Sequence, residues 1–568
     1  MDNSSDLISK AQEWIAGDPD PATRAELQDL LDRGDLDEIA DRMAGTLEFG
    51  TAGLRGKVEA GSNRMNRAVV IRATWGLARH VLETSGTDRG PVVVGRDARL
   101  SSPRLLEDTV GVLVAAGLAV TVIDGPAPTP VVAFLAKETG AVAAVIITAS
   151  HNPPADNGYK AYASKAVQIV PPDDTSIAGW IDQAPAAVDV PLVEDPLSHP
   201  LATVVGSEVF DSYMSAVLEA VPARESGGDL EIVYSAMHGV GGDTLTALFA
   251  RAGFHRLVPV PDQFDPDGRF PTVAFPNPEE PGAMDLSNSL AAEIDADLVI
   301  ANDPDADRLA VSLPIDGGWR QLSGNQIGVL LADFLLEYTD STDPLVIQSI
   351  VSSPMLASVA RAHGAKYDRT LTGFKWICNA ALDRAEAGDG EFVFGYEEAL
   401  GYSVGRTVRD KDGISAALAF SVMASQAQSA GGTVWDRLGA LYARHGLWVS
   451  TQKSVVREGA AGAEEIAAAM VRLADHHPDS LAGIDVTAVN DYRTGAETRP
   501  RWLGATALVE FVLGDSGRAL IRPSGTEPKI KIYVDLRGDA GNDWMAAEEG
   551  LLETAAAVAS DLAGFSGF

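Results

Sequence analysis

Residues 144–154 read Ala-Val-Ile-Ile-Thr-Ala-Ser-His-Asn-Pro-Pro, an apolar run that passes directly into a polar loop. The apolar run predicts a buried strand, and Pro153 prevents a helix from following it. Three further joins have the same form: LVIANDPDADR at 298–308, FVFGYEEALGY at 392–402 and ALIRPSGTEPK at 519–529. In open α/β sheets, ligands bind beyond the carboxyl ends of strands, so we expect these four loops to converge on one cleft.

Around these joins the pattern of strand, loop and helix repeats, which is typical of α/β layers. We predict strands at Pro91–Val94, Val142–Ile147, Glu231–Tyr234, Leu298–Ile300, Leu345–Gln348 and Phe392–Phe394. Residues 1–45 carry a helical pattern that is broken around Asp18–Pro21. Changes of composition and of hydrophobic periodicity predict a helical extension at residues 1–45. Four domains are predicted to follow it, at residues 46–205, 206–318, 319–445 and 446–568.

The composition indicates a multidomain globular protein of 568 residues, 46% of them hydrophobic. The single cysteine, Cys378, excludes an intrachain disulfide and fits a reducing cytosol. We expect a cytoplasmic protein, since no signal peptide is visible and the longest apolar run, Val110–Ile123, is too short for a bilayer. The net charge of −36 opposes binding to nucleic acid or anionic membranes, so any phosphate site must be locally basic.

The loop after the strand at 142–147 carries the first candidate residues. We expect Ser150 to be exposed on a stiff turn, where backbone N–H groups are available to an anion. His151 and Lys160 can supply positive charge or transfer a proton. The alternative is a plain serine-capped turn.

Asp303, Asp305 and Asp307 form the second candidate group. At i, i+2 and i+4 of an extended segment, their carboxylates project to one face and repel one another unless a cation lies between them. Hard oxygen ligands in this number suit Mg²⁺. An EF-hand is excluded, because its required glycine and final glutamate are replaced by Arg308 and Pro314. A solvated acidic turn is the alternative.

The remaining loops predict substrate contacts. Glu397 and Glu398 can accept hydrogen bonds from sugar hydroxyls, although such a pair beside a helix start is also a plain cap. The last loop combines a guanidinium, two hydroxyls and a glycine, a set that matches a tetrahedral dianion. Its residues are Arg522, Ser524, Gly525 and Thr526, followed by Lys531. Arg55 lies in a glycine-rich turn suited to phosphate, and Lys375 is a candidate acid or base.

Together these loops resemble those of the α-D-phosphohexomutase superfamily, which includes phosphoglucomutases and phosphomannomutases. TASHNP at 148–153 is similar to the family's phosphoserine loop, DPDADR at 303–308 to its metal loop and RPSGTEPKIK at 522–531 to its phosphate loop. The match runs in the family's order over about residues 47–533. The resemblance implies four domains in a heart shape, three of them α/β and the last a smaller α+β domain.

The resemblance also implies an activity. Ser150 would carry a phosphoryl group beside Mg²⁺ held by Asp303, Asp305, Asp307 and an oxygen on Ser150. Arg308, Lys531, Glu397 and Glu398 would bind substrate together with the loop at 522–526. A sugar 1-phosphate would become a 6-phosphate through a bisphosphorylated intermediate, with Arg55, His151, Lys160 and Lys375 assisting.

The sugar is less determined than the reaction. Many relatives have a serine where this chain has Ala399, and GYEEALGY with GFKW and RDKDG (409–413) is similar to a branch that includes phosphopentomutases. We expect glucose or mannose phosphates, with ribose or deoxyribose phosphates as the alternative. A Mg²⁺-dependent sugar phosphatase and a noncatalytic sugar-phosphate sensor are minor alternatives, and a monomer and a dimer are both open.

Overall fold

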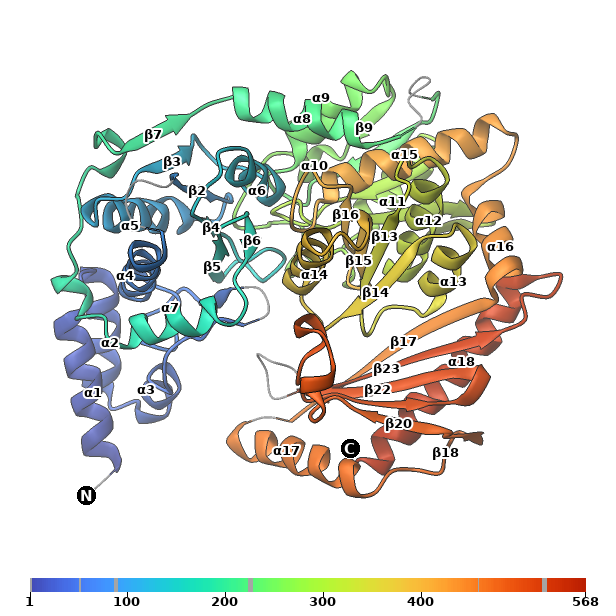
Figure 1. Ribbon diagram of the computed structural model, residues 1–568. Helices are drawn as coiled ribbons and strands as arrows, with labels where there is room; N and C mark the ends of the chain where they lie inside the picture. Colours follow the sequence, from blue (N-terminus) through green and yellow to red (C-terminus); the bar gives the residue numbers. More distant parts are fainter. Residues whose placement is uncertain (1–2, 51–52, 86–89, 223–227, 458, 524–528) are drawn as a thin grey trace. The chain divides into compact units, whose positions relative to one another are not determined.

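The computed structural model describes residues 3–50, 53–85, 90–222, 228–457, 459–523 and 529–568 (Figure 1). The chain forms two compact units. The first comprises Met1–Leu322 and Gly401–Leu418, and the second comprises Ser323–Leu400 and Ala419–Phe568.

Three helices precede the first sheet: α1 (Asn3–Gly17), α2 (Pro21–Arg33) and α3 (Leu36–Arg42). Asp20 caps α2 by accepting a hydrogen bond from the Ala22 N–H, and Gly34 ends it with a φ of 68°. The helices share a small core that contains Ala11, Leu27, Leu30 and Ile39. The helical pattern of this segment is therefore present, and the gap between α1 and α2 lies at the expected break.

The first sheet contains the strand that opens the Ser150 loop. Its order is β1 (Leu54–Lys57), β5 (Asp156–Ala163), β4 (Ala143–Ile147), β2 (Val92–Arg96), β3 (Val120–Ile123) and β7 (Ala202–Val205), with β6 (Val167–Gln168) beside β5. Strands β4, β2, β3 and β7 are parallel, whereas β5 runs antiparallel to β4 and β1. The helices of this domain are α4 (Arg67–Thr84), α5 (Ser102–Ala115), α6 (Thr129–Glu138) and α7 (Asp173–Asp182). Valines and isoleucines of β2, β3 and β4 form its core.

The second sheet, also in the first unit, opens the aspartate loop. Its order is β12 (Gly318–Gln321), β11 (Ala310–Ile315), β10 (Leu298–Ala301), β8 (Ile232–Ser235) and β9 (Leu257–Pro259). The helices between its strands include α8 (Glu208–Ala220), α9 (Gly242–Arg251), α10 (Pro261–Phe264) and α11 (Asp285–Glu293). Strands β8, β9 and β10 are parallel, so the loop after β10 leaves at a carboxyl edge. The short strand β16 (Gly401–Val404) also belongs to this unit.

The second unit begins with parallel strands β14 (Lys366–Thr370), β13 (Pro344–Ser349) and β15 (Glu391–Glu397). Its first helices are α12 (Gly324–Glu337), α13 (Met355–Ala362) and α14 (Phe374–Glu386). They are followed by α15 (Gly413–Ser429), which belongs to this unit from Ala419 onward, and by α16 (Val434–His445). Every strand expected from the apolar runs is present, although the bounds of several differ from the predicted ones by a few residues.

The C-terminal domain is an antiparallel sheet with helices. Its order is β17 (Leu447–Val456), β23 (Lys529–Gly538), β22 (Gly517–Pro523), β21 (Val509–Val512) and β20 (Ala488–Asp491). Helix α18 (Trp544–Phe565) packs against β17 and β23, and α17 (Gly459–Asp475) against β22 and β23 (Figure 1). Over the described ranges, no helix combines the length and apolar character that a bilayer span requires.

Candidate active site

Ser150 lies in the loop after β4, with its backbone in the left-handed region at a φ of 51°. Its hydroxyl donates a hydrogen bond to Asp303 Oδ2 at 2.7 Å, and His151 Nδ1 lies 3.1 Å from the same hydroxyl oxygen. A positive φ outside glycine is uncommon, and such residues cluster at functional sites. The expectation that Ser150 is exposed is wrong: only 1% of the residue is accessible, because a loop from the second sheet brings Asp303 against its hydroxyl.

The three aspartates after β10 gather at one point. One carboxylate oxygen from each lies within 4.8 Å of the other two, and all three residues are fully buried. A turn brings them together, rather than the extended alternation that we expected. Ala306 adopts a φ of 57°, and Asp303 Oδ1 accepts a hydrogen bond from the Asp307 N–H at 3.1 Å.

This cluster is able to hold a divalent metal ion. Asp305 Oδ1 and Asp307 Oδ1 are buried, and neither has a hydrogen-bond partner in the part of the chain that the structure describes. A buried carboxylate oxygen without a partner is unfavourable, and a hard cation that prefers oxygen ligands would relieve this.

Two lysines balance the negative charge. Lys160 Nζ donates to Asp305 Oδ2 at 2.7 Å and to Asp307 Oδ2 at 2.8 Å, and Lys411 Nζ lies 3.0 Å from Asp307 Oδ2. Burial opposes the charge on Asp307, but Lys160 and Lys411 hold its pKa below the usual range. Burial, followed by the charges of Asp305 and Asp307, raises the pKa of Asp303 well above its ordinary value. A bound cation would favour ionised Asp303.

Arg99, which sequence reasoning missed, holds the backbone of the Ser150 loop. The residue is 2% exposed. Its guanidinium donates hydrogen bonds to the carbonyl oxygens of Ser150 (2.8 Å), Asn152 (2.5 Å), Pro153 (2.7 Å) and Asp156 (2.8 Å). A planar guanidinium with five donors can fasten several carbonyls at once, so Arg99 positions Ser150 without touching the hydroxyl.

Arg55 and His151 border the same loop. Arg55 projects from β1, and its Nη1 donates to Asn152 Oδ1 at 3.1 Å. Burial, followed by the charges of Arg308 and Arg55, lowers the pKa of His151 well below its ordinary value. The imidazole is therefore neutral at pH 7. The first unit thus brings together Ser150, the three aspartates and four of the predicted basic residues: Arg55, His151, Lys160 and Arg308.

The third loop lies in the second unit. Glu397 ends β15, and its Oε1 accepts a hydrogen bond from the Gly373 N–H at 2.7 Å. Glu398 Oε2 accepts hydrogen bonds from Ser349 Oγ at 2.9 Å and Ser352 Oγ at 3.0 Å. These bonds orient the strand end, and a sugar contact for either glutamate stays a prediction.

Tyr533 connects this loop with the predicted phosphate loop. Arg522 Nη2 donates to Tyr533 Oη at 3.2 Å. Burial raises the pKa of Tyr533 to about 12; Arg522 opposes this shift, and Glu398 and Glu397 add to it. The charges of Arg522, Glu398 and Glu397 therefore all influence this phenol.

The other predicted residues of the second unit are placed less completely. Lys531 lies opposite Arg522 in the register of β22 and β23, and Lys375 is in the first turn of α14. Ser524, Gly525 and Thr526 lie outside the described residues.

The sequence carries a usable signal for Arg99, one of the two residues that sequence reasoning missed, and none for Lys411. Arg99 belongs to a polar loop, Gly95-Arg96-Asp97-Ala98-Arg99, at the end of a predicted strand, which is the same criterion that identified Ser150. Lys411 lies in RDKDG, a segment whose charges alone do not indicate a partner.

Domain models of one family match the chain in order. They are described as phosphoglucomutase/phosphomannomutase alpha/beta/alpha domains I, II and III, at residues 46–187, 211–314 and 323–444, and the C-terminal domain, at 463–549. The expected fold class, three α/β domains followed by a C-terminal domain, is confirmed.

Individual relatives agree with these matches. A probable phosphomannomutase of Haemophilus influenzae is 39% identical over 488 residues, covering 84% of this chain and 94% of its own length. A phosphopentomutase of Mus musculus is 33% identical over 569 residues, covering 94% of this chain and 91% of its own. The crystal structure of a putative phosphomannomutase from Thermus thermophilus has a TM-score of 0.66 at 21% identity, covering 90% of this chain and 99% of its own.

Proposed function

We propose that this chain, which belongs to the phosphoglucomutase/phosphomannomutase family, is a phosphomutase acting on hexose phosphates. It would interconvert the 1-phosphate and the 6-phosphate of glucose, mannose or both. In this proposal Ser150 is the phosphate carrier. The observation that supports it most directly is the 2.7 Å hydrogen bond from Ser150 Oγ to Asp303 within the buried aspartate cluster.

We infer that the cluster is a Mg²⁺ site, with ligands from Asp303, Asp305, Asp307 and an oxygen on Ser150. The bound ion would supply positive charge next to the transferring phosphoryl group. Arg55 adds positive charge beside the Ser150 loop, and Arg99 keeps that loop in place.

The transfer requires a donor and an acceptor of protons. When a sugar hydroxyl attacks the phosphorus on Ser150, the phosphorus–Oγ bond breaks, the hydroxyl loses its proton and Oγ gains one. His151 Nδ1 lies 3.1 Å from Oγ, within hydrogen-bond distance of the atom that gains this second proton. Lys160 donates to two carboxylates, which stabilises its proton. Lys375 is the other candidate to accept the sugar's proton.

The phosphate that the substrate carries would bind at Arg522, Lys531, Ser524, Gly525 and Thr526. Arg522 Nε is buried and has no hydrogen-bond partner among the described residues, which supports its use as a donor to a phosphate oxygen. The bisphosphorylated sugar would then turn end over end, so that its other phosphate faces Ser150. Glu397 and Glu398 would accept hydrogen bonds from the ring hydroxyls in both orientations.

A phosphopentomutase acting on ribose or deoxyribose phosphates is the second candidate. It is favoured by the 33% identity to the phosphopentomutase of Mus musculus across 94% of this chain. Ala399, which replaces a serine that many relatives have, also removes a hydroxyl-binding group that a hexose site would use.

A coupled assay across glucose, mannose, ribose and deoxyribose 1-phosphates tests this proposal. We expect isomer formation that depends on Mg²⁺ and on catalytic sugar bisphosphate, with hexose turnover exceeding pentose turnover. Release of free phosphate without isomer would contradict the mutase proposal, and faster pentose turnover would replace the hexose assignment.

A further inference from the structure

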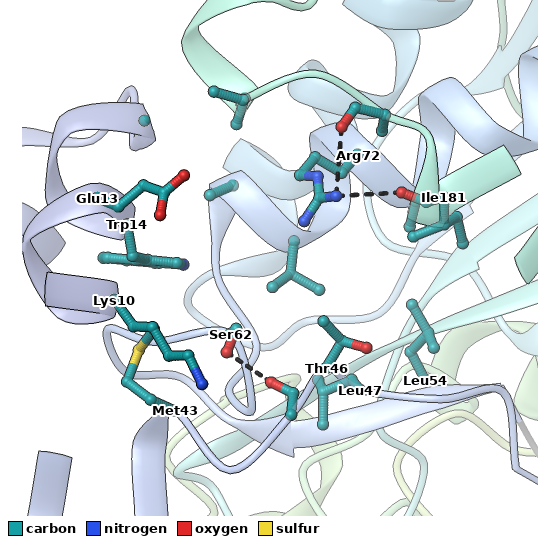
Figure 2. A pocket seen from close by; sticks show the side chains of 18 residues that line it. Lys10, Glu13, Trp14, Met43, Thr46, Leu47, Leu54, Ser62, Arg72 and Ile181 are labelled. Atoms are coloured by element: carbon teal, nitrogen blue, oxygen red, sulfur yellow. Dashed lines mark hydrogen bonds between the residues drawn. The ribbon is translucent and has the colours of Figure 1, made fainter. Parts of the chain in front are cut away.

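A pocket of about 560 Å³ lies between the N-terminal helices and the first sheet's helices (Figure 2). Trp14 of α1 lines one side and Arg72 of α4 another, while Leu47 and Leu54 contribute apolar walls. This volume is within the range of small-molecule sites, which are mainly apolar and carry a few polar groups.

Arg72 is the cation that this pocket offers to a ligand. Its Nη2 donates to the carbonyl oxygens of Ile181 at 3.1 Å and Ala184 at 3.3 Å. Its Nε is buried without a hydrogen-bond partner, and the structure describes no carboxylate in ion-pair contact with this guanidinium. Lys10 and Glu13, both exposed, also line the pocket, and Lys10 forms an ion pair with Asp6 at 3.3 Å. A charged group with an unused buried donor is suited to an anion.

The pocket is separate from the candidate active site. None of its lining residues is one of the predicted catalytic, metal or substrate residues. It does contact the same strand: Leu54 lines the pocket, and the next residue of β1, Arg55, bonds to Asn152 in the Ser150 loop. Successive side chains of a strand point to opposite faces, so β1 separates the two sites.

We propose that this pocket binds a small organic anion, with its carboxylate, sulfonate or phosphate group at Arg72 and its flat apolar body between Trp14 and Leu47. An aromatic or branched aliphatic body would bury apolar surface that a sugar phosphate does not have.

The fluorescent sulfonate 8-anilinonaphthalene-1-sulfonate is the probe for the test on the full-length protein. We expect one saturable site, and Arg72→Met should weaken binding by about tenfold. Arg79→Met is the matched control: this exposed arginine of α4 lies over the Trp180 ring at 4.9 Å and does not line the pocket. It should leave the affinity unchanged.

A second variant and a second probe test the same proposal independently of Arg72→Met. Val69→Trp fills the pocket, keeps Arg72 and should abolish binding, while circular dichroism verifies the fold of each variant. The uncharged N-phenyl-1-naphthylamine should bind more weakly than the sulfonate and should not distinguish Arg72→Met from wild type. The proposal is overturned if binding does not saturate, if either folded variant, Arg72→Met or Val69→Trp, binds within about twofold of wild type, or if the uncharged probe binds equally well.

Discussion

The guanidinium of Arg99 donates a 2.8 Å hydrogen bond from Nη2 to the carbonyl oxygen of Ser150. The nucleophile candidate is therefore held through its backbone by a residue 51 positions earlier in the chain. Arg99 Nε also lies 3.2 Å from Asp97 Oδ2, so its buried charge has a carboxylate partner. The hydrogen bonds from Arg99 to the carbonyl oxygens of this loop stabilise the left-handed backbone of Ser150.

Replacing Arg99 with Met should destabilise the first unit and lower turnover together. The change leaves four carbonyls and Asp97 without their donor, and removing one member of a buried charged network costs about 3–5 kcal/mol. The urea midpoint should fall clearly. Arg104→Met, which alters an arginine whose side chain is 49% exposed, should change stability by about 0.5 kcal/mol or less. Equal effects of both changes would contradict the positioning role.

Ser150→Ala should remove nearly all mutase activity and leave sugar-phosphate binding intact. The change deletes the proposed phosphate carrier and none of the predicted phosphate ligands. A coupled assay measures turnover, and calorimetry measures binding of glucose 1-phosphate. The exposed Ser212→Ala should behave as wild type. A Ser150→Ala rate above about one tenth of wild type would show that Ser150 is not the carrier.

Chelation should abolish activity and Mg²⁺ should restore it. Added Mg²⁺ should also raise the thermal midpoint, because a ligand at 100 times its Kd stabilises the native state by about 2.7 kcal/mol. Asp307→Asn should lose both responses, since Asp307 Oδ1 is one of the two unpartnered oxygens. Asp316→Asn, an exposed acid between β11 and β12, is the control. Full activity in excess chelator would refute the metal assignment.

Glu397→Ala should weaken every sugar substrate, whereas Ala399→Ser should sharpen the choice between glucose and mannose 1-phosphates. A carboxylate accepts hydrogen bonds from hydroxyls of any sugar, while an apolar wall discriminates weakly. The ratio of kcat/KM values for the two hexoses measures this. If wild type already discriminates more than about a hundredfold, Ala399 does not determine the specificity.

Stability should fall as the pH drops below about 6.5, in part because of His238. Burial lowers the pKa of His238, whose Nε2 lies 2.8 Å from Thr272 Oγ1. The unfolded chain therefore binds a proton that the native state excludes, until the pH reaches the lowered pKa. His238→Asn should make the free energy of unfolding less dependent on pH, as measured by urea titrations at several pH values. Asparagine tolerates the left-handed backbone at this position. The exposed His477→Gln should leave the dependence unaltered.

The local sequence pattern determined much of the secondary structure of this protein. Apolar runs predicted the strands, and the polar loops at their ends made Ser150, the three aspartates, Glu397 and Arg522 candidate site residues. The strand predictions succeed because strand periodicity and turn chemistry depend on neighbouring residues, and parallel strands place the candidate loops at the carboxyl edges of their sheets. The family resemblance, which rests on the same loops, was also available from sequence.

Only the tertiary structure decided which side chains meet. Ser150 and Asp303 are 153 positions apart, and their contact buries a hydroxyl that its turn alone would expose. Asp307 gains Lys411 from a distant part of the chain, and Arg72 lies in a pocket that α1 helps to enclose. Such contacts depend on how whole elements pack, which is a property of the summed burial of many side chains and not of any short segment.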